Sequence, residues 1–136
     1  MTDPELVAKK LAQIRDYVRE LGEEAQPEKL ETDVRERRFI EHSLQLAIQA
    51  ALDAASHIVS DERLGEPRTN RELFVLLQNA GWIGADLAAG LERMAGFRNV
   101  LVHGYDTVDL GVVRDILENR LQDLIDYCAV VESRLQ

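Results

Sequence analysis

The sequence predicts an all-α protein, a bundle of four to five helices, on the strength of two observations. Apolar residues recur at steps of three and four over most of the chain, which is the spacing of one face of an α-helix. Stretches that alternate apolar and polar residues, as half-buried β-strands do, are never longer than a few residues. With 136 residues, of which 46% are hydrophobic, the chain is expected to form a single domain, residues 1–136, around one core.

The first expected helix begins near the N-terminus and ends at a glycine. Thr2 and Glu5, three residues apart, match a capping box, in which two side chains satisfy the first free backbone amides of a helix. Gly22 and the polar residues up to Pro27 predict its end. The apolar stripe of this helix consists of Leu11, Ile14, Val18 and Leu21.

A second, long helix is expected from about Lys29 to Val59. Its opening turns, from Arg35 to Arg38, are highly charged, and we expect them to protrude or to pack against a partner. Its second half is rich in alanine, which permits another helix to approach closely. The apolar stripe consists of Ile40, Leu44, Ala47, Ile48, Ala51, Ala55, Ile58 and Val59.

Two shorter helices are expected in the middle of the chain. The third runs from about Arg71 to Asn79, with Thr69 or Asn70 as its N-cap. The fourth follows a turn that contains two glycines, and Gly96 is expected to interrupt it, because glycine disfavours the interior of a helix.

The last expected helix begins near Asp109 and runs almost to the C-terminus. Its apolar positions are separated by 3, 4, 4, 3, 4, 3 and 4 residues, which suits a bundle helix with one buried seam. Cys128 lies in this seam and is assigned to packing. The seam consists of Leu110, Val113, Leu117, Leu121, Leu124, Cys128, Val131 and Leu135.

The charge balance excludes general attraction to nucleic acid or to anionic lipid. The chain carries 16 basic and 25 acidic residues, which gives a net charge of −9 at pH 7. Lys9, Lys10 and Lys29 are the only lysines, so the basic residues are mostly arginines, which suit fixed, bidentate contacts with phosphate. Any nucleic-acid binding must therefore occur at a local arginine site.

A cytoplasmic protein without a membrane segment is expected. No apolar run approaches the roughly 18–20 residues that a membrane span needs. The N-terminal stretch up to Leu11 alternates charged and small apolar residues, unlike a signal peptide. The one cysteine cannot form an internal disulfide, which fits a reducing compartment.

The segment from Arg98 to Tyr105 carries the candidate chemistry. The sequence has no cysteine pair, no Glu-x-x-His and no phosphate-binding glycine loop, so no metal and no cofactor are expected. Arg98, Asn99, His103 and Tyr105 fall within eight residues. Histidine transfers protons near neutral pH, and arginine stabilises the charge that develops on a phosphodiester, which together allow RNA cleavage without a metal. On composition alone, a structural role for His103 stays equally open.

The spacing of Arg98 and His103 sets a geometric condition. Residues five apart on a continuous helix point about 140° away from each other and lie about 7.5 Å apart along the axis. Either the helix breaks at Gly104 and His103 turns toward the arginine, or two copies of the motif meet across a dimer interface; we expect both. Arg37 and His42 have the same spacing, so the spacing alone is not specific.

The stretch 94–105 resembles the signature of the HepT-like toxins, which belong to the HEPN superfamily of helical ribonucleases. That signature is an arginine, four residues, a histidine, any residue and a tyrosine, and it is matched by Arg98, His103 and Tyr105. Asn99 matches the polar residue that usually follows the arginine.

The similarity covers most of the chain. It includes residues 43–53 and 79–83 and continues downstream through Asp109. One position departs from the pattern, because Gly104 stands where family members often carry an acidic residue. The pair Arg37 and His42 lacks the residues that flank the signature and receives no role.

The resemblance implies a HEPN bundle of four to five helices that forms a homodimer, with the two motifs facing each other in a cleft. It implies the toxin of a type VII toxin–antitoxin system, a metal-independent endoribonuclease that cuts RNA, in several relatives tRNA. Arg98 and His103 would be catalytic, with Asn99 as a supporting polar residue. The partner would be an MntA-like minimal nucleotidyltransferase antitoxin, which would transfer AMP from ATP to Tyr105.

Two other hypotheses compete with that of a nuclease. The first is a non-catalytic HEPN helical module that presents a substrate to a partner nucleotidyltransferase, and the second is a dimeric helical adaptor without a site. The presence of Arg98, His103 and Tyr105 favours the nuclease over both.

Overall fold

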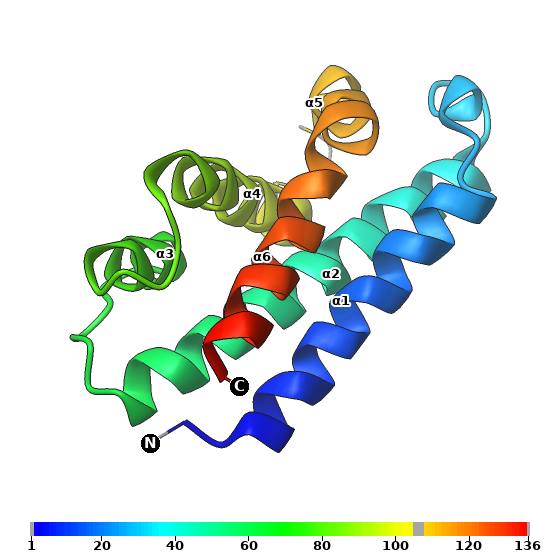
Figure 1. Cartoon of the computed structure of the whole chain (residues 1–136). Helices are drawn as coiled ribbons and strands as arrows, with labels where there is room; N and C mark the ends of the chain where they lie inside the picture. The colour runs from blue at the N-terminus through cyan, green and yellow to red at the C-terminus, as the bar shows by residue number, and fades with distance from the viewer. Residues whose placement is uncertain (1, 105–107, 136) are drawn as a thin grey trace.

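The computed structural model describes residues 2–104 and 108–135, and over these residues all regular structure is helical (Figure 1). The three segments α5, η3 and α6 follow one another without a break and form one long final helix. The bundle therefore has five helices, which confirms the predicted fold class. The elements are α1 (Pro4–Glu24), the 3₁₀ turn η1 (Pro27–Lys29), α2 (Val34–Asp61), α3 (Asn70–Asn79), α4 (Ala85–His103), α5 (Leu110–Asp115), the π-helical η3 (Ile116–Arg120) and α6 (Leu121–Leu135).

Helices α1 and α2 run side by side, and the final helix packs against them (Figure 1). Helix α6 contacts both α1 and α4, while α3 and α4 pack against each other and against α2. In Figure 1, α3 and α4 lie to one side of α6 and α1 lies to the other. Both ends of the described chain contribute to one pocket, through Thr2 and Leu135, so they are neighbours.

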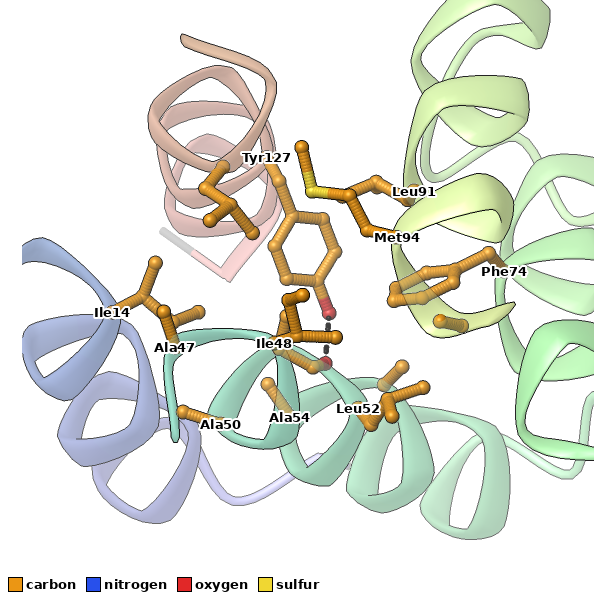
Figure 2. Packing of buried hydrophobic residues seen from close by; sticks show 14 of the residues in the cluster. Ile14, Ala47, Ile48, Ala50, Leu52, Ala54, Phe74, Leu91, Met94 and Tyr127 are labelled. Atoms are coloured by element: carbon orange, nitrogen blue, oxygen red, sulfur yellow. Dashed lines mark hydrogen bonds between the residues drawn. The ribbon is translucent and has the colours of Figure 1, made fainter. Parts of the chain in front are cut away.

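Tyr127 of α6 lies in the middle of the core (Figure 2). Its hydroxyl donates a hydrogen bond of 2.9 Å to the carbonyl of Ala51 in α2, which satisfies the polar end of a fully buried side chain. Its ring meets the ring of Phe74 in α3 edge-on, with 5.8 Å between the centroids. The side chain thus links three helices, with Met94 of α4 drawn beside it.

The alanines of α2 are buried as predicted and allow the close approach of neighbouring helices. None of Ala47, Ala51, Ala54 and Ala55 exposes more than 1% of its surface. Since an alanine side chain is a single methyl group, the α2 backbone can lie close to the helices that cover it.

The start of α1 differs from the predicted capping box. Asp3, and not Thr2, is the N-cap, because its Oδ1 accepts hydrogen bonds from the amides of Glu5 (3.0 Å) and Leu6 (3.4 Å). The prediction that Thr2 and Glu5 cap each other was therefore wrong. An aspartate at this place also suits the positive end of the helix dipole.

Helix α2 begins at Val34 rather than near Lys29, because an aspartate caps its N-terminus, as in α1. Asp33 Oδ1 accepts hydrogen bonds from the amides of the second and third following residues at 2.9 and 3.3 Å. In the charged opening turn, Glu36 accepts a bond of 2.8 Å from the amide of Gln26. This carboxylate fastens the loop that enters the helix.

Helix α4 is continuous through Gly96, so the predicted interruption was wrong. The backbone at Gly96 does not have a positive φ, and a methyl group at this position would find its nearest atoms in Arg71, at 3.8 and 3.9 Å. The flanking residues Ala95 and Phe97 are buried, and their packing stabilises the helix despite the low helix propensity of glycine. The predicted Thr69 cap of α3 is confirmed by its Oγ1, which accepts from the amide of Glu72 at 3.4 Å.

The final helix contains a π-helical turn that the regular spacing of its apolar residues did not predict. Over η3 the buried position is Ile116, whereas the predicted seam residues Leu117 and Leu121 are only half-buried. Below that turn the seam follows the prediction, and Tyr127 joins it. The fully buried or nearly buried residues are Val113, Ile116, Leu124, Tyr127, Cys128 and Val131.

Candidate active site at the end of α4

The last turns of α4 carry three of the four residues that the sequence singled out. Arg98 is half-buried, while Asn99 and the terminal helical residue His103 are exposed. Gly104 caps the helix, and its amide donates a bond of 2.7 Å to the carbonyl of Val100. With φ −81° and ψ −12°, Gly104 has a backbone conformation open to any residue, so this turn does not depend on glycine. Tyr105 lies outside the described residues.

Arg98 presents a guanidinium that no carboxylate neutralises within the described part of the chain. Its Nη1 donates a hydrogen bond of 3.2 Å to Oδ1 of Asn99. Its Nε is shielded from solvent, and among the described residues it has no hydrogen-bond partner. The amide of Asn99 therefore orients the guanidinium, and donors remain for an anion such as a phosphodiester.

Because α4 is continuous, the helix geometry sets the directions in which the side chains of Arg98 and His103 leave it. Both belong to the uninterrupted helix from Ala85 to His103, so the geometry of residues five apart applies, with about 140° between them around the axis. The helix ends after His103, as predicted, but the backbone of His103 itself is still helical. Within one chain the two side chains therefore leave the helix in different directions. A site that uses both on one phosphate is more readily completed by a second copy of the motif.

The second pair with the same spacing has a structural role at its arginine. Arg37 Nη1 donates a hydrogen bond of 3.3 Å to the carbonyl of Leu30, in the turn before α2. His42 lies on the exposed surface of α2. Arg37 therefore fastens the turn that precedes α2.

An arginine pair that the sequence did not single out lines a cavity on another side of α4. Arg93 of α4 and Arg120 of η3 flank it, and Phe97 forms part of its wall. The two arginines are far apart in sequence and meet only through the packing of the final helix on α4. The sequence offers one hint of this pair. Arg120 is a charged residue four positions before the buried Leu124, on the helix that carries the apolar seam.

Residues 2–104 and 108–135 contain neither a metal-binding cluster nor a membrane-crossing helix. No cluster of three or more histidine, cysteine, aspartate or glutamate side chains is arranged there to hold a metal ion. None of the helices described combines the length and apolar character that a membrane crossing requires.

Comparison with known proteins places the chain among ribonucleases. Residues 7–131 match the family model described as ribonuclease HepT-like. The mRNA nuclease HepT of Shewanella oneidensis is 32% identical over 91 residues, which are 67% of this chain and 68% of that protein. The tRNA nuclease HepT of Aphanizomenon flos-aquae is 36% identical over 95 residues, 70% of this chain and 65% of that protein.

A solved structure agrees with the fold over almost the whole chain. It is the tri-AMPylated HEPN toxin of Shewanella oneidensis in complex with the MNT antitoxin. The TM-score is 0.85 at 26% identity, and the match covers 98% of this chain and 99% of that one. The family match contains α2 to α4 in full and most of α1, including the turn with Arg98 and His103. The chain belongs to the ribonuclease HepT-like family of HEPN proteins.

Proposed function

We propose that the protein is the toxin of a HEPN/MNT toxin–antitoxin pair, a metal-independent endoribonuclease whose catalytic residues are Arg98 and His103. The observation that carries the proposal is the unneutralised guanidinium of Arg98 five residues before an exposed histidine, inside a region that matches a ribonuclease family. Residues 1–136 would act as one HEPN domain in the cytoplasm.

The chemistry assigns one task to each side chain. His103 takes the proton from a 2′-hydroxyl, whose oxygen then attacks the adjacent phosphorus. Arg98 stabilises the extra negative charge on the phosphoryl oxygens, and Asn99 holds its guanidinium in place. The bond to the 5′-oxygen breaks as that oxygen gains a proton, leaving a 2′,3′-cyclic phosphate and a 5′-hydroxyl. RNA is the substrate because the attacking group is its 2′-hydroxyl, and the named relatives act on mRNA and tRNA.

A homodimer would complete this site. The directions of Arg98 and His103 on one helix call for a second motif on the other side of the phosphate. Val100 of α4 lies between Arg98 and His103 and exposes 39% of its surface. Exposed apolar side chains beside a charged site suit the contact between two copies.

The antitoxin would be an MntA-like nucleotidyltransferase that silences the toxin by transferring AMP from ATP to Tyr105. The solved relative is an AMPylated toxin bound to an MNT antitoxin, which supports this partner. The modification would place a phosphodiester anion and a nucleoside two residues from His103. That anion would compete with RNA for Arg98.

The test is cleavage of total tRNA by the purified protein in EDTA, beside His103→Ala and Arg98→Ala. We expect cleavage by the unaltered protein and a loss of at least about 100-fold in either variant, the range for a removed acid–base or charge-stabilising group. His42→Ala is the matched control, since it removes another exposed histidine and should leave cleavage unchanged.

Two outcomes would contradict the proposal. Cleavage that persists in His103→Ala and Arg98→Ala would remove these residues from the chemistry. If the unaltered protein is inactive, intact mass shows whether Tyr105 carries AMP. An inactive and unmodified protein would instead indicate the non-catalytic module that presents a substrate to a nucleotidyltransferase.

A further inference from the structure

A cavity of about 200 Å³ lies between α4 and the α5–η3 segment, near the catalytic turn. Its inner wall is apolar, because it is formed by Met94, Phe97 and Ile116. These side chains expose no more than 8% of their surfaces. Gly90 adds bare backbone to the wall. The volume is below the roughly 300–1,000 Å³ of pockets for drug-sized ligands, so its occupant is a smaller group, such as one planar ring system.

Two arginines stand at the edge of this apolar wall. Arg120 forms an ion pair with Asp115, but the 3.8 Å between its Nε and Oδ2 of Asp115 is too long for a hydrogen bond, so the N–H donors of the guanidinium stay available. Arg93 is exposed and makes no hydrogen bond or close ion pair with any residue described in the structure. Within the lining the two arginines outnumber the one carboxylate, Asp115, while the carboxylate of Asp123 lies against Gly90 of the wall and interacts electrostatically with both arginines.

The surface beyond the cavity has the opposite charge. A neighbouring hollow shares Arg93 and Arg120 but adds three carboxylates, Asp86, Asp123 and Asp126. These carboxylates would repel an anionic strand from the end of α4 that carries Asp86. Such a strand would be accepted at the other end, where α4 carries Arg98.

The cavity is close to the catalytic turn along the same helix. Phe97 in its wall immediately precedes Arg98, and His103 follows six residues later, about 9 Å along the axis. A short single strand can therefore occupy the cavity and the catalytic turn together. The π-helical turn η3 contributes Ile116 to the wall and Arg120 to the rim, and such turns often occur at functional sites.

We propose that this cavity is a subsite for one base of the RNA substrate, with Arg93 and Arg120 binding the adjoining phosphate. An apolar wall beside arginine guanidinium groups is a combination by which proteins hold an unpaired base and its backbone. The inference rests on the proposed ribonuclease function and adds a residue pair that binds substrate without taking part in the cleavage step.

The test follows the methyl group of Met94, which lies in the cavity wall. The chain has two methionines, Met1 and Met94, so a methionine-labelled NMR spectrum contains a readily assigned signal from the cavity. The full chain carries His103→Ala so that RNA is not cut. We expect a short single-stranded RNA and nucleoside monophosphates to shift the Met94 signal saturably, and inorganic phosphate at equal concentration to leave it unchanged.

Variants then separate the subsite from general electrostatics. Arg93→Gln/Arg120→Gln should weaken RNA binding by about ten-fold and lower the salt dependence of log K by about 0.7, the loss of one phosphate contact on a single strand. Arg63→Gln/Arg68→Gln, the matched control, removes the same charge from the exposed loop after α2 and should bind as before. Val112→Trp covers the cavity from its exposed rim without a change of charge, and should also weaken binding.

The inference is wrong if RNA binds, by fluorescence anisotropy, while the Met94 signal stays in place. Equal affinity in the Arg93/Arg120 variant and in the control would overturn it as well. A failure of the subsite alone leaves cleavage dependent on His103, whereas a failure of the ribonuclease function appears as absent cleavage by the unmodified wild-type protein.

Discussion

Tyr127 and Cys128 are neighbours on α6 that bind backbone carbonyls of two different helices. The tyrosine hydroxyl donates to Ala51 of α2, and the thiol lies 3.7 Å from the carbonyl of Leu11 in α1. Neither side chain is exposed to solvent. Burial in apolar surroundings disfavours the charged forms, so it raises the pKa of both side chains, that of Cys128 to about 11.

This raised pKa predicts a loss of stability in alkali. The folded-state pKa of the Cys128 thiol, about 11, lies above its ordinary value of 9, so the unfolded chain loses its proton first. The stabilising contribution is complete below pH 9 and is lost as the pH rises to 11, by up to about 3 kcal/mol. Urea unfolding between these pH values measures it. Cys128→Ala should show a shallower fall, to which Tyr127 still contributes, and an identical fall would rule out the thiol as a cause.

The proposed site residues show how much of a site the sequence reveals. Arg98, His103 and Tyr105 were recognisable because a family signature includes all three within a short segment. The hydrogen bond from Arg98 to Asn99 could not be read from the sequence, because it depends on how two neighbouring side chains turn on a helix end. Arg93 and Arg120 carried no signature, and their meeting depends on how two distant helices pack.

At the scale of elements, two glycines of α4 differ in what surrounds them. A methyl group at Gly96 would find its nearest atoms at 3.8 Å, an ordinary contact. A methyl group at Gly90 would lie 2.5 Å from Oδ2 of Asp123, which packs against the α4 backbone at this point. A methyl group would therefore displace the Asp123 carboxylate at Gly90 but make only ordinary contacts at Gly96.

This difference predicts opposite outcomes for two similar substitutions. Gly96→Ala should raise the free energy of unfolding by about 0.5–1 kcal/mol, because alanine favours a helix interior and space is present. Gly90→Ala should gain less or lose stability, because the Asp123 carboxylate must move. Denaturant titration of both variants checks the order, and a larger gain at Gly90 would contradict the packing described here.

The helices themselves were largely predictable, whereas their ends and one internal turn were not. Apolar spacing located all five helices, since each buries one stripe of residues. Asp3 and Asp33 each decided a helix start by accepting two backbone hydrogen bonds, and nearby alternatives such as Thr2 had equal chemical merit. The π-helical turn was hidden because a regular apolar spacing continues through Leu117 and Leu121, although Ile116 is the residue that packs inward.

For the whole molecule, the proposed assembly of two copies is the property that the exposed surface of α4 bears on. Val100 lies on α4 between Gly96 and His103, with 39% of its surface exposed. If two motifs face each other, this side chain lies in or beside the contact between the copies.

Val100→Arg should therefore weaken dimer formation and cleavage together, since a charge in the contact is costly to desolvate. Sedimentation or light scattering measures the mass, and tRNA cleavage measures the activity. Val130→Arg is the matched control, because Val130 on α6 is equally exposed, at 38%, and should leave mass and activity as they are. A dimer that survives Val100→Arg with full activity would show that this face of α4 is not shared.

The contact between the first and the last helix also has a consequence for how the protein is made. Helix α1 is covered in part by α6, and the carbonyl of Leu11 faces a thiol that is synthesised 117 residues later. A nascent chain thus cannot bury this face of α1 until α6 has left the ribosome. Such distant contacts slow folding relative to a bundle of neighbouring helices. For a protein that cuts RNA, this order delays the complete fold, and with it the activity, until after synthesis has reached the final helix.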